Sequence, residues 1–130
     1  MLSLSVEEFV GEEVEVKPID RSGWYYITED GSVISVKSGR PQVLNGWTHV
    51  DGYNRVSLYL HGGKVNEYAH RLVAFAFIPG YFPGAVVNHK NGDKLDNRVV
   101  NLEWLSIGDN VRHAHENGLR DLSQPNRYYD

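Results

Sequence analysis

Residues 85–110 read AVVNHKNGDKLDNRVVNLEWLSIGDN, in which two short apolar runs are separated by a long polar stretch. The apolar residues 85–87 predict a short strand, and residues 102–105 predict a second one after a polar loop rich in Asn, Asp and Gly. A helix is expected at residues 107–117, because a Ser-x-x-Asp pair precedes it and a glycine follows it. The C-terminal third of the chain therefore predicts the order strand, loop, strand, helix.

The N-terminal half predicts two β-hairpins. Residues 24–28 and 32–36 are runs of aromatic and β-branched residues on either side of an Asp-Gly turn. Residues 53–60 and 64–69 form a second pair around a His-Gly-Gly turn. In the first strand of this pair the even positions are mostly apolar, while the odd positions are aromatic or polar. The even positions are therefore expected to face the core.

A short buried helix is expected at residues 70–78, where Leu, Val, Phe and Ala crowd the segment and a Pro-Gly pair ends it. Together these elements predict an α+β fold, in which antiparallel hairpins and a short helix precede the strand–loop–strand–helix unit. The chain is expected to divide into an acidic N-terminal segment, a β-rich module, that unit and a polar tail, at residues 1–20, 21–80, 81–118 and 119–130.

The 130 residues carry a formal net charge of −4, but the charge is unevenly distributed. Residues 1–20 hold six of the 17 acidic residues and one of the 13 basic ones, so residues 21–130 have a net charge of +1. Any basic surface is therefore a local face rather than a field over the whole molecule. The acidic start is interpreted as a solvated segment, or alternatively as a lid that competes with phosphate for such a face.

The composition excludes several classes of protein. Because the chain has no cysteine, disulfide staples, cysteine-ligated zinc and a thiol nucleophile are ruled out, which is typical of a reducing cytoplasm. No apolar run approaches the roughly 20 residues that a bilayer span needs, and the longest candidate is Leu72–Ile78. Residues 1–8 lack both a basic and an apolar region, so neither a secretory signal nor a membrane partner is expected.

Three residues of the C-terminal unit stand at a distinctive spacing: His89, Asn101 and Asn110 are 12 and 9 residues apart. Together with Asn88 before the histidine and a Leu-Glu-Trp run after Asn101, this pattern resembles the HNH nuclease family, in particular the branch found in phage homing endonucleases. The resemblance covers about residues 22–119. It implies a ββα-metal (His-Me finger) fold for the C-terminal unit and a DNA-binding role for the β-rich module.

The resemblance also implies an activity: hydrolysis of phosphodiester bonds in double-stranded DNA, with one divalent ion, Mg²⁺ or Mn²⁺, in the cytoplasm of a host cell. Such hydrolysis requires a deprotonated water, a Lewis acid on the phosphate and a stabilised leaving oxygen. His89 is expected to be the general base, with the side-chain carbonyl of Asn101 at its Nδ1–H and Nε2 free to accept the proton. Asn88 and Asn110 are expected to offer side-chain oxygens to the metal.

Asn88 departs from the commonest form of the family, in which an Asp precedes the catalytic histidine. An amide oxygen is a weaker ligand for Mg²⁺ than a carboxylate, and no carboxylate is evident among the expected ligands. The metal is therefore expected to bind weakly until DNA supplies a phosphate oxygen.

A site of this size needs additional contact surface to bind a DNA duplex. The polar face of the second hairpin and the loops beside that hairpin can supply this surface. An alternative for the hairpin is an ordinary solvent face, and the loop residues Asn97 and Arg98 could instead tie their loop internally. Binding to such a face is expected to weaken steeply with salt. The expected DNA-binding residues are Lys37, Arg40, Tyr53, Arg55, Tyr59, Lys64, Asn66, Lys90, Lys94 and Arg98.

Two other functions fit the same residues. One is a catalytically weak or inactive DNA-binding protein that keeps the scaffold, although intact His89, Asn101 and Asn110 disfavour it. The other is an RNA nuclease, whose attack through the 2′-hydroxyl needs no metal. The sequence leaves the target site, the choice between a nick and a double-strand cut, and the choice between monomer and dimer open.

Overall fold

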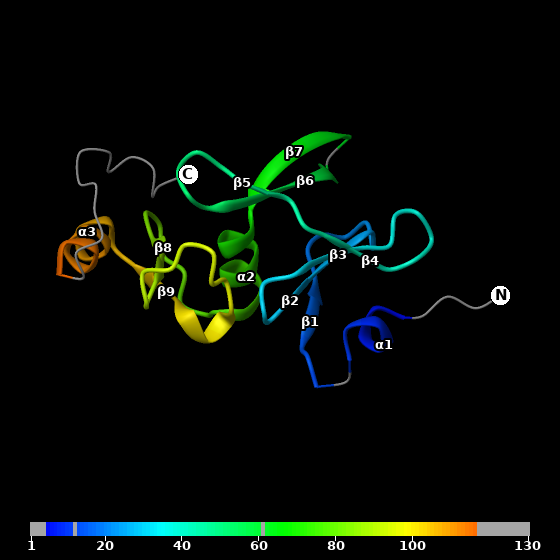
Figure 1. Ribbon diagram of the computed structural model, residues 1–130, viewed down its shortest axis with the longest axis horizontal. Helices are drawn as coiled ribbons and strands as arrows, with labels where there is room; N and C mark the ends of the chain where they lie inside the picture. The colour runs from blue at the N-terminus through cyan, green and yellow to red at the C-terminus, as the bar shows by residue number, and fades with distance from the viewer. Residues whose placement is uncertain (1–4, 12, 61, 117–130) are drawn as a thin grey trace.

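The computed structural model describes residues 5–11, 13–60 and 62–116. These residues form three antiparallel sheets, and a central helix packs among them (Figure 1). The α+β prediction is confirmed. Within the described part of the chain, none of the helices combines the length and apolar character that crossing a bilayer requires.

The first sheet is a four-stranded meander whose inner strands are almost fully buried. The Asp-Gly turn predicted between two of its strands is present, and Gly31 there has a φ of 95°, which favours glycine. The strands are β1 (Val16–Pro18), β2 (Tyr25–Thr28), β3 (Val33–Ser35) and β4 (Gln42–Leu44).

The second sheet contains β5 (Trp47–Thr48), β6 (Asn54–Leu60) and β7 (Gly63–Tyr68) in that order. The even positions Val56, Leu58 and Leu60 of β6 are buried, as their alternation predicts. The odd positions pair across the sheet, Ser57 with Asn66 and Tyr59 with Lys64, so these side chains share the opposite face.

Helix α2 (Ala69–Phe77) connects the two halves of the molecule. In Figure 1 the β5–β7 sheet lies above it, the β1–β4 sheet to one side, and the C-terminal unit to the other. Val73 and Ala74 of this helix have no exposed surface and join one core with side chains of all three sheets. Because each fully buried aliphatic side chain contributes about 1.5–3 kcal/mol, this shared core fixes the C-terminal unit against the β-rich module.

The C-terminal unit has the predicted order of elements. Strands β8 (Val86–His89) and β9 (Leu102–Leu105) pair in an antiparallel register, and helix α3 (Ile107–Glu116) packs against both. The long loop between the strands ends in a single 3-10 turn, η1 (Val99–Asn101). The helix end expected at Gly118 and the tail at 119–130 lie outside the described residues.

The acidic N-terminal segment contains more structure than its composition suggested. Helix α1 (Val6–Val10) begins with a capping box, in which the Ser5 hydroxyl accepts from the Glu8 amide and the Glu8 carboxylate accepts from the Ser5 amide. Strand β1 pairs with β2, so the first sheet runs across the boundary expected at residue 20. The short strands β4 and β5 were also not predicted, because their exposed residues carry no clear alternation.

Candidate active site

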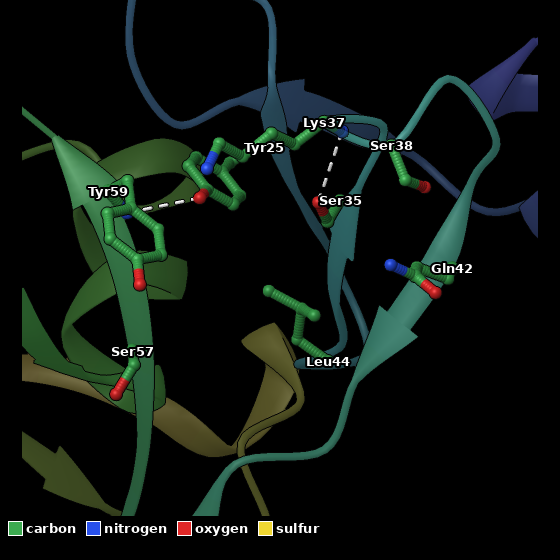
Figure 2. Close-up of a pocket in the computed structure, with 8 residues that line it drawn as sticks. All are labelled: Tyr25, Ser35, Lys37, Ser38, Gln42, Leu44, Ser57 and Tyr59. Carbon is green, nitrogen blue, oxygen red and sulfur yellow. Dashed lines mark hydrogen bonds between the residues drawn. The ribbon is translucent and has the colours of Figure 1, made fainter. Parts of the chain in front are cut away.

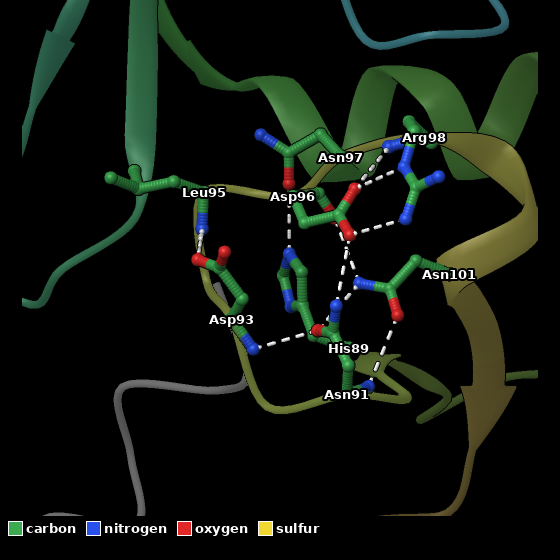
Figure 3. Close-up of polar contacts among 8 residues, drawn as sticks. All are labelled: His89, Asn91, Asp93, Leu95, Asp96, Asn97, Arg98 and Asn101. Carbon is green, nitrogen blue, oxygen red and sulfur yellow. Dashed lines mark hydrogen bonds and ion pairs between the residues drawn. The ribbon is translucent and has the colours of Figure 1, made fainter.

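The side chain of His89 ends strand β8 and is 5% exposed. Its Nε2 lies 2.8 Å from the side-chain oxygen of Asn97 (Figure 3). Because that oxygen can only accept, Nε2 carries the proton, and Nδ1 is the nitrogen with a lone pair. The expectation that Nε2 would be the basic nitrogen is therefore wrong, since Asn97 occupies it.

The expected contact of Asn101 with the His89 ring is also wrong. Asn101 instead ties the loop together: its Oδ1 accepts from the Asn91 amide at 3.0 Å, and its Nδ2 donates to the Asn91 side chain at 3.0 Å and to the Asp96 carbonyl at 2.9 Å. Figure 3 shows the His89–Asn97 bond apart from the bonds that Asn101 makes. Asn101 thus acts on His89 only through the loop that carries Asn97.

The pKa of His89 is lowered from its usual value, chiefly by burial, while the bond to Asn97 acts in the opposite direction. The ring lies 5.2 Å from that of His70, whose pKa burial lowers further. Tyr53 packs against both histidines, with ring centroids 4.7 Å from His70 and 5.6 Å from His89. The rings of Tyr53 and His70 thus form an aromatic wall that keeps His89 neutral, which is the protonation state that a general base requires.

Beside His89, the side chains of Asn88 and Asn110 meet as predicted for a pair of metal ligands. The Asn110 Nδ2 donates to the Asn88 Oδ1 at 3.1 Å, and both side chains are 4% exposed. The Asn110 Oδ1 is buried without a hydrogen-bond partner, which is costly for a carbonyl unless something else fills its place. This orphaned oxygen, next to a second amide oxygen, fits a hard cation that takes oxygen ligands.

Among the described residues, no group of three His, Cys, Asp or Glu side chains is placed to hold a metal ion. A metal ion at this site would therefore be bound by amide oxygens. One carboxylate does touch this pair: the Glu103 Oε2 accepts from the Asn88 Nδ2 at 2.8 Å. The sequence reasoning missed Glu103, although the antiparallel register that places it opposite Asn88 follows from pairing the two predicted strands.

Several of the expected DNA-binding residues have other partners. Tyr53 is 4% exposed and forms the wall behind His89, so its assignment to a DNA-binding face is wrong. The Lys94 ammonium donates to the Asp51 carbonyl at 2.9 Å and lies over the Tyr53 ring, so it ties the β8–β9 loop to the loop before β6 rather than projecting into solvent. Arg98 makes a two-pronged ion pair with Asp96, both bonds 2.7 Å.

The Asp96–Arg98 pair confirms the alternative that this stretch ties its own loop. Hydrogen bonding to Arg98 lowers the pKa of Asp96, and the same pairing raises the pKa of Arg98. Lys90 is exposed, and its carbonyl lies 3.2 Å from the His113 Nε2. Of the loop cations, Lys90 and the outer side of Arg98 are thus the ones that face solvent.

The remaining expected residues lie on one face that ends at the histidines. Lys37 lies over the Tyr59 ring at 4.1 Å, and Tyr59 pairs with Lys64 across the sheet. Next along the strands, Asn66 accepts from the Ser57 hydroxyl at 2.7 Å. At the far end, the Arg55 guanidinium lies over Tyr68, and Tyr68 packs against His70.

Between the first two sheets this face is hollowed to a volume of about 420 Å³ (Figure 2). Lys37 and Tyr59 flank its mouth, and the Tyr25 hydroxyl accepts from the Tyr59 amide at 3.0 Å, which joins the two sheets there. Arg40 is exposed in the adjoining β3–β4 turn. The hollow is lined by Tyr25, Ser35, Lys37, Ser38, Gln42, Leu44, Ser57 and Tyr59.

Comparison with known proteins shows which family this geometry resembles. A profile of the HNH endonuclease family matches residues 67–112. The chain is 37% identical over 102 residues to the DNA endonuclease I-HmuI of Bacillus phage SP01, an alignment that spans 78% of this chain and 58% of that protein. The chain is therefore similar to HNH endonucleases over more than three quarters of its length.

One further HNH protein and one solved structure are also similar. The putative HNH homing endonuclease YosQ from the SPbeta prophage of Bacillus subtilis is 39% identical over 105 residues, with 79% of this chain and 58% of YosQ aligned. A solved structure of DNA binding and cleavage by the HNH homing endonuclease I-HmuI superposes with a TM-score of 0.74 at 36% identity, over 87% of this chain and 64% of that one. The chain thus spans little more than half the length of these curated relatives.

The turn at Gly31 supports the HNH site from the first sheet, because a Cβ at this position would lie 2.9 Å from the Cβ of Asn97. We expect Gly31→Ala to push Asn97 away from His89. The control Gly23→Ala has a similar positive φ with open space around it, so both variants bear the backbone strain and only Gly31→Ala adds the clash. Urea denaturation should show Gly31→Ala to be less stable than Gly23→Ala by about 1–3 kcal/mol. Equal stabilities would mean that the turn does not press on the catalytic loop.

Proposed function

We propose that the protein is a metal-dependent endonuclease that hydrolyses phosphodiester bonds in duplex DNA, of the phage homing type, acting in the cytoplasm of a host cell. The observation that carries the proposal is the buried, unpartnered Asn110 Oδ1, which lies beside Asn88 at the strand end where the neutral ring of His89 is held. The names of the relatives support it, since they are endonucleases and homing endonucleases.

The chain's own residues divide the chemistry between them. Asn97 holds His89 so that Nδ1 accepts a proton from a water, which attacks the phosphorus in line with the 3′ oxygen. The P–O3′ bond breaks, leaving a 3′-hydroxyl and a 5′-phosphate. Mg²⁺ or Mn²⁺ bound through the oxygens of Asn88 and Asn110 would polarise the phosphate and neutralise charge on the leaving oxygen.

The proposal is tested by incubating supercoiled plasmid and phage genomic DNA with the protein and Mg²⁺ or Mn²⁺. We expect nicked or linear DNA with either ion and intact DNA with EDTA. Binding without cleavage on every DNA tested would favour the second candidate, a DNA-binding protein on this scaffold, which the amide at position 88 also fits. Cleavage of RNA that persists in EDTA would instead identify an RNA nuclease.

The proposal places the DNA backbone along the face from Lys37 and Tyr59 to Arg55, because this face leads from the hollow to the catalytic histidine. Lys64 and Arg40 extend its basic edge. A duplex lying there contacts phosphates through cations whose counterions it releases, so affinity falls as salt rises.

We therefore expect Lys37→Ala and Lys64→Ala each to weaken binding and to reduce the slope of log affinity against log salt by about 1. Fluorescence anisotropy of a labelled duplex in 50–200 mM KCl, concentrations of the order at which phosphate contacts are sensitive, measures this slope. The control is Lys17→Gln, because the Lys17 ammonium donates to the Ala76 carbonyl on helix α2 and lies over Phe77, away from the proposed face. A slope that Lys37→Ala leaves unchanged would show that the duplex binds elsewhere.

A further inference from the structure

The carboxylate of Glu103 contacts one of the proposed metal ligands, Asn88, from the neighbouring strand. Asn88 and Glu103 are directly opposite each other in the β8–β9 pair, and the Asn88 Nδ2 donates to the Glu103 Oε2 at 2.8 Å. On its other side, the Asn88 Oδ1 accepts from the Asn110 Nδ2. Glu103, Asn88 and Asn110 thus form a chain of hydrogen bonds from a partly exposed carboxylate to the buried, unpartnered Asn110 Oδ1.

This chain fixes which end of the Asn88 amide faces the site. An ionised carboxylate only accepts hydrogen bonds, so it holds the NH₂ end of the amide toward strand β9. The Oδ1 end must then turn toward Asn110, where a cation would be bound. Without the carboxylate the amide is free to turn its NH₂ group toward the site, and an NH₂ group repels a cation.

The charge of the site also supports a role for Glu103 in metal binding. The two expected ligands are neutral amides, and a divalent cation in a site without negative charge loses hydration that nothing repays. The Glu103 carboxylate is the anion in hydrogen-bond contact with this pair among the described residues. Groups that hold metal ligands from behind commonly change metal affinity by 10- to 100-fold when they are replaced.

We propose that Glu103 is a positioning residue of the metal site: it orients Asn88 and supplies the negative charge that an Asp at position 88 would otherwise provide. This inference rests on the proposed function. It predicts that moving the charge from position 103 to position 88 preserves the site, whereas removing it does not. A merely structural bond between the two strands predicts no such exchange.

The test is a titration of ¹⁵N-labelled protein with Mn²⁺ alone, in which the paramagnetic ion broadens nearby amide signals and reports binding up to millimolar concentrations. In the wild type we expect the side-chain amide signals of Asn88 and Asn110 to broaden before those elsewhere. In Glu103→Gln the same broadening should need at least about tenfold more Mn²⁺. The double variant Asn88→Asp/Glu103→Gln has no amide at position 88, so it is followed on the Asn110 signal, which should broaden at a Mn²⁺ concentration within about threefold of that for the wild type. The control Glu7→Gln removes an exposed carboxylate on α1 and should match the wild type.

The outcomes separate this inference from the proposed function. If Mn²⁺ broadens no signals at Asn88 and Asn110 in the wild type, the metal site itself is absent and the proposed function fails. If the wild type responds and Glu103→Gln responds at the same concentration, the metal site stands and the role of Glu103 is overturned. A weakened Glu103→Gln that Asn88→Asp does not restore would reduce Glu103 to a strand-pairing residue, and the spectra themselves report whether each variant is folded.

Discussion

We expect the replacement of His89 by alanine to lower the rate of plasmid nicking by about 10²- to 10⁴-fold, the usual contribution of a general base. The reason is geometric as well as chemical. The ring is 5% exposed, its Nε2 is bonded to Asn97, and burial lowers its pKa, so a neutral imidazole with one free nitrogen is held at the strand end. Initial rates on supercoiled plasmid in excess Mg²⁺ measure the loss.

The matched control for this variant is His49→Ala, which removes another histidine, in the connection just after strand β5. The His49 ring contacts Tyr68 edge-on, and its removal leaves the His89–Asn97 bond untouched. Its nicking rate should stay within about threefold of the wild type. If His89→Ala nicks as fast as His49→Ala, His89 is not the base and the assignment of the site fails.

Much of the fold was predictable because the deciding signals are local. The alternation along β6, the Asp-Gly turn before β3 and the apolar run of α2 each carry the period of one element, and the structure confirms them. The exposed edge strands β4 and β5 were missed because a strand of two or three residues without a buried face has no period to detect.

The site was predictable to the level of which residues gather, but not of which atoms touch. The side chains of Asn88 and Asn110 meet, as expected, because strand end and helix start are fixed by the unit's topology, and His89 follows Asn88 at the end of the same strand. That Asn97 rather than Asn101 bonds to the His89 ring could not be predicted from the sequence. Both are polar residues of one irregular loop, and only the path of its backbone decides which amide reaches the ring.

Tyr53 shows a different limit of prediction from strand alternation. Its place before β6 gave it the same odd-numbered phase as Arg55 and Tyr59, and the alternation put it on their face. Its ring packs on Tyr68, the cross-strand partner of Arg55, and is covered by His70 and His89, so it lies on the expected side but is buried. A periodic pattern therefore predicts which side of a sheet a residue occupies, but not whether another part of the chain covers it.

Replacing Asn110 by alanine separates the functional oxygen from its structural surroundings. The variant loses the orphaned Oδ1, which relieves the cost of burying an unpaired carbonyl, and it loses the Nδ2 donor, which leaves the Asn88 Oδ1 unpaired. Each of these changes is worth about 1–3 kcal/mol, and they have opposite signs, so the free energy of unfolding should change by no more than about 2 kcal/mol in either direction.

Activity has no such compensation, because the alanine removes an oxygen proposed to bind the cation. The nicking rate of Asn110→Ala should therefore fall by about 10²-fold or more in millimolar Mg²⁺, while Asn45→Ala, in the exposed connection before β5, leaves it unchanged. Urea denaturation and plasmid nicking on the same preparations give both quantities. If Asn110 serves folding, its replacement should lower the stability and the activity of the protein together. If it serves the metal, its replacement should lower the activity alone, because an unpaired buried oxygen does not stabilise the folded state.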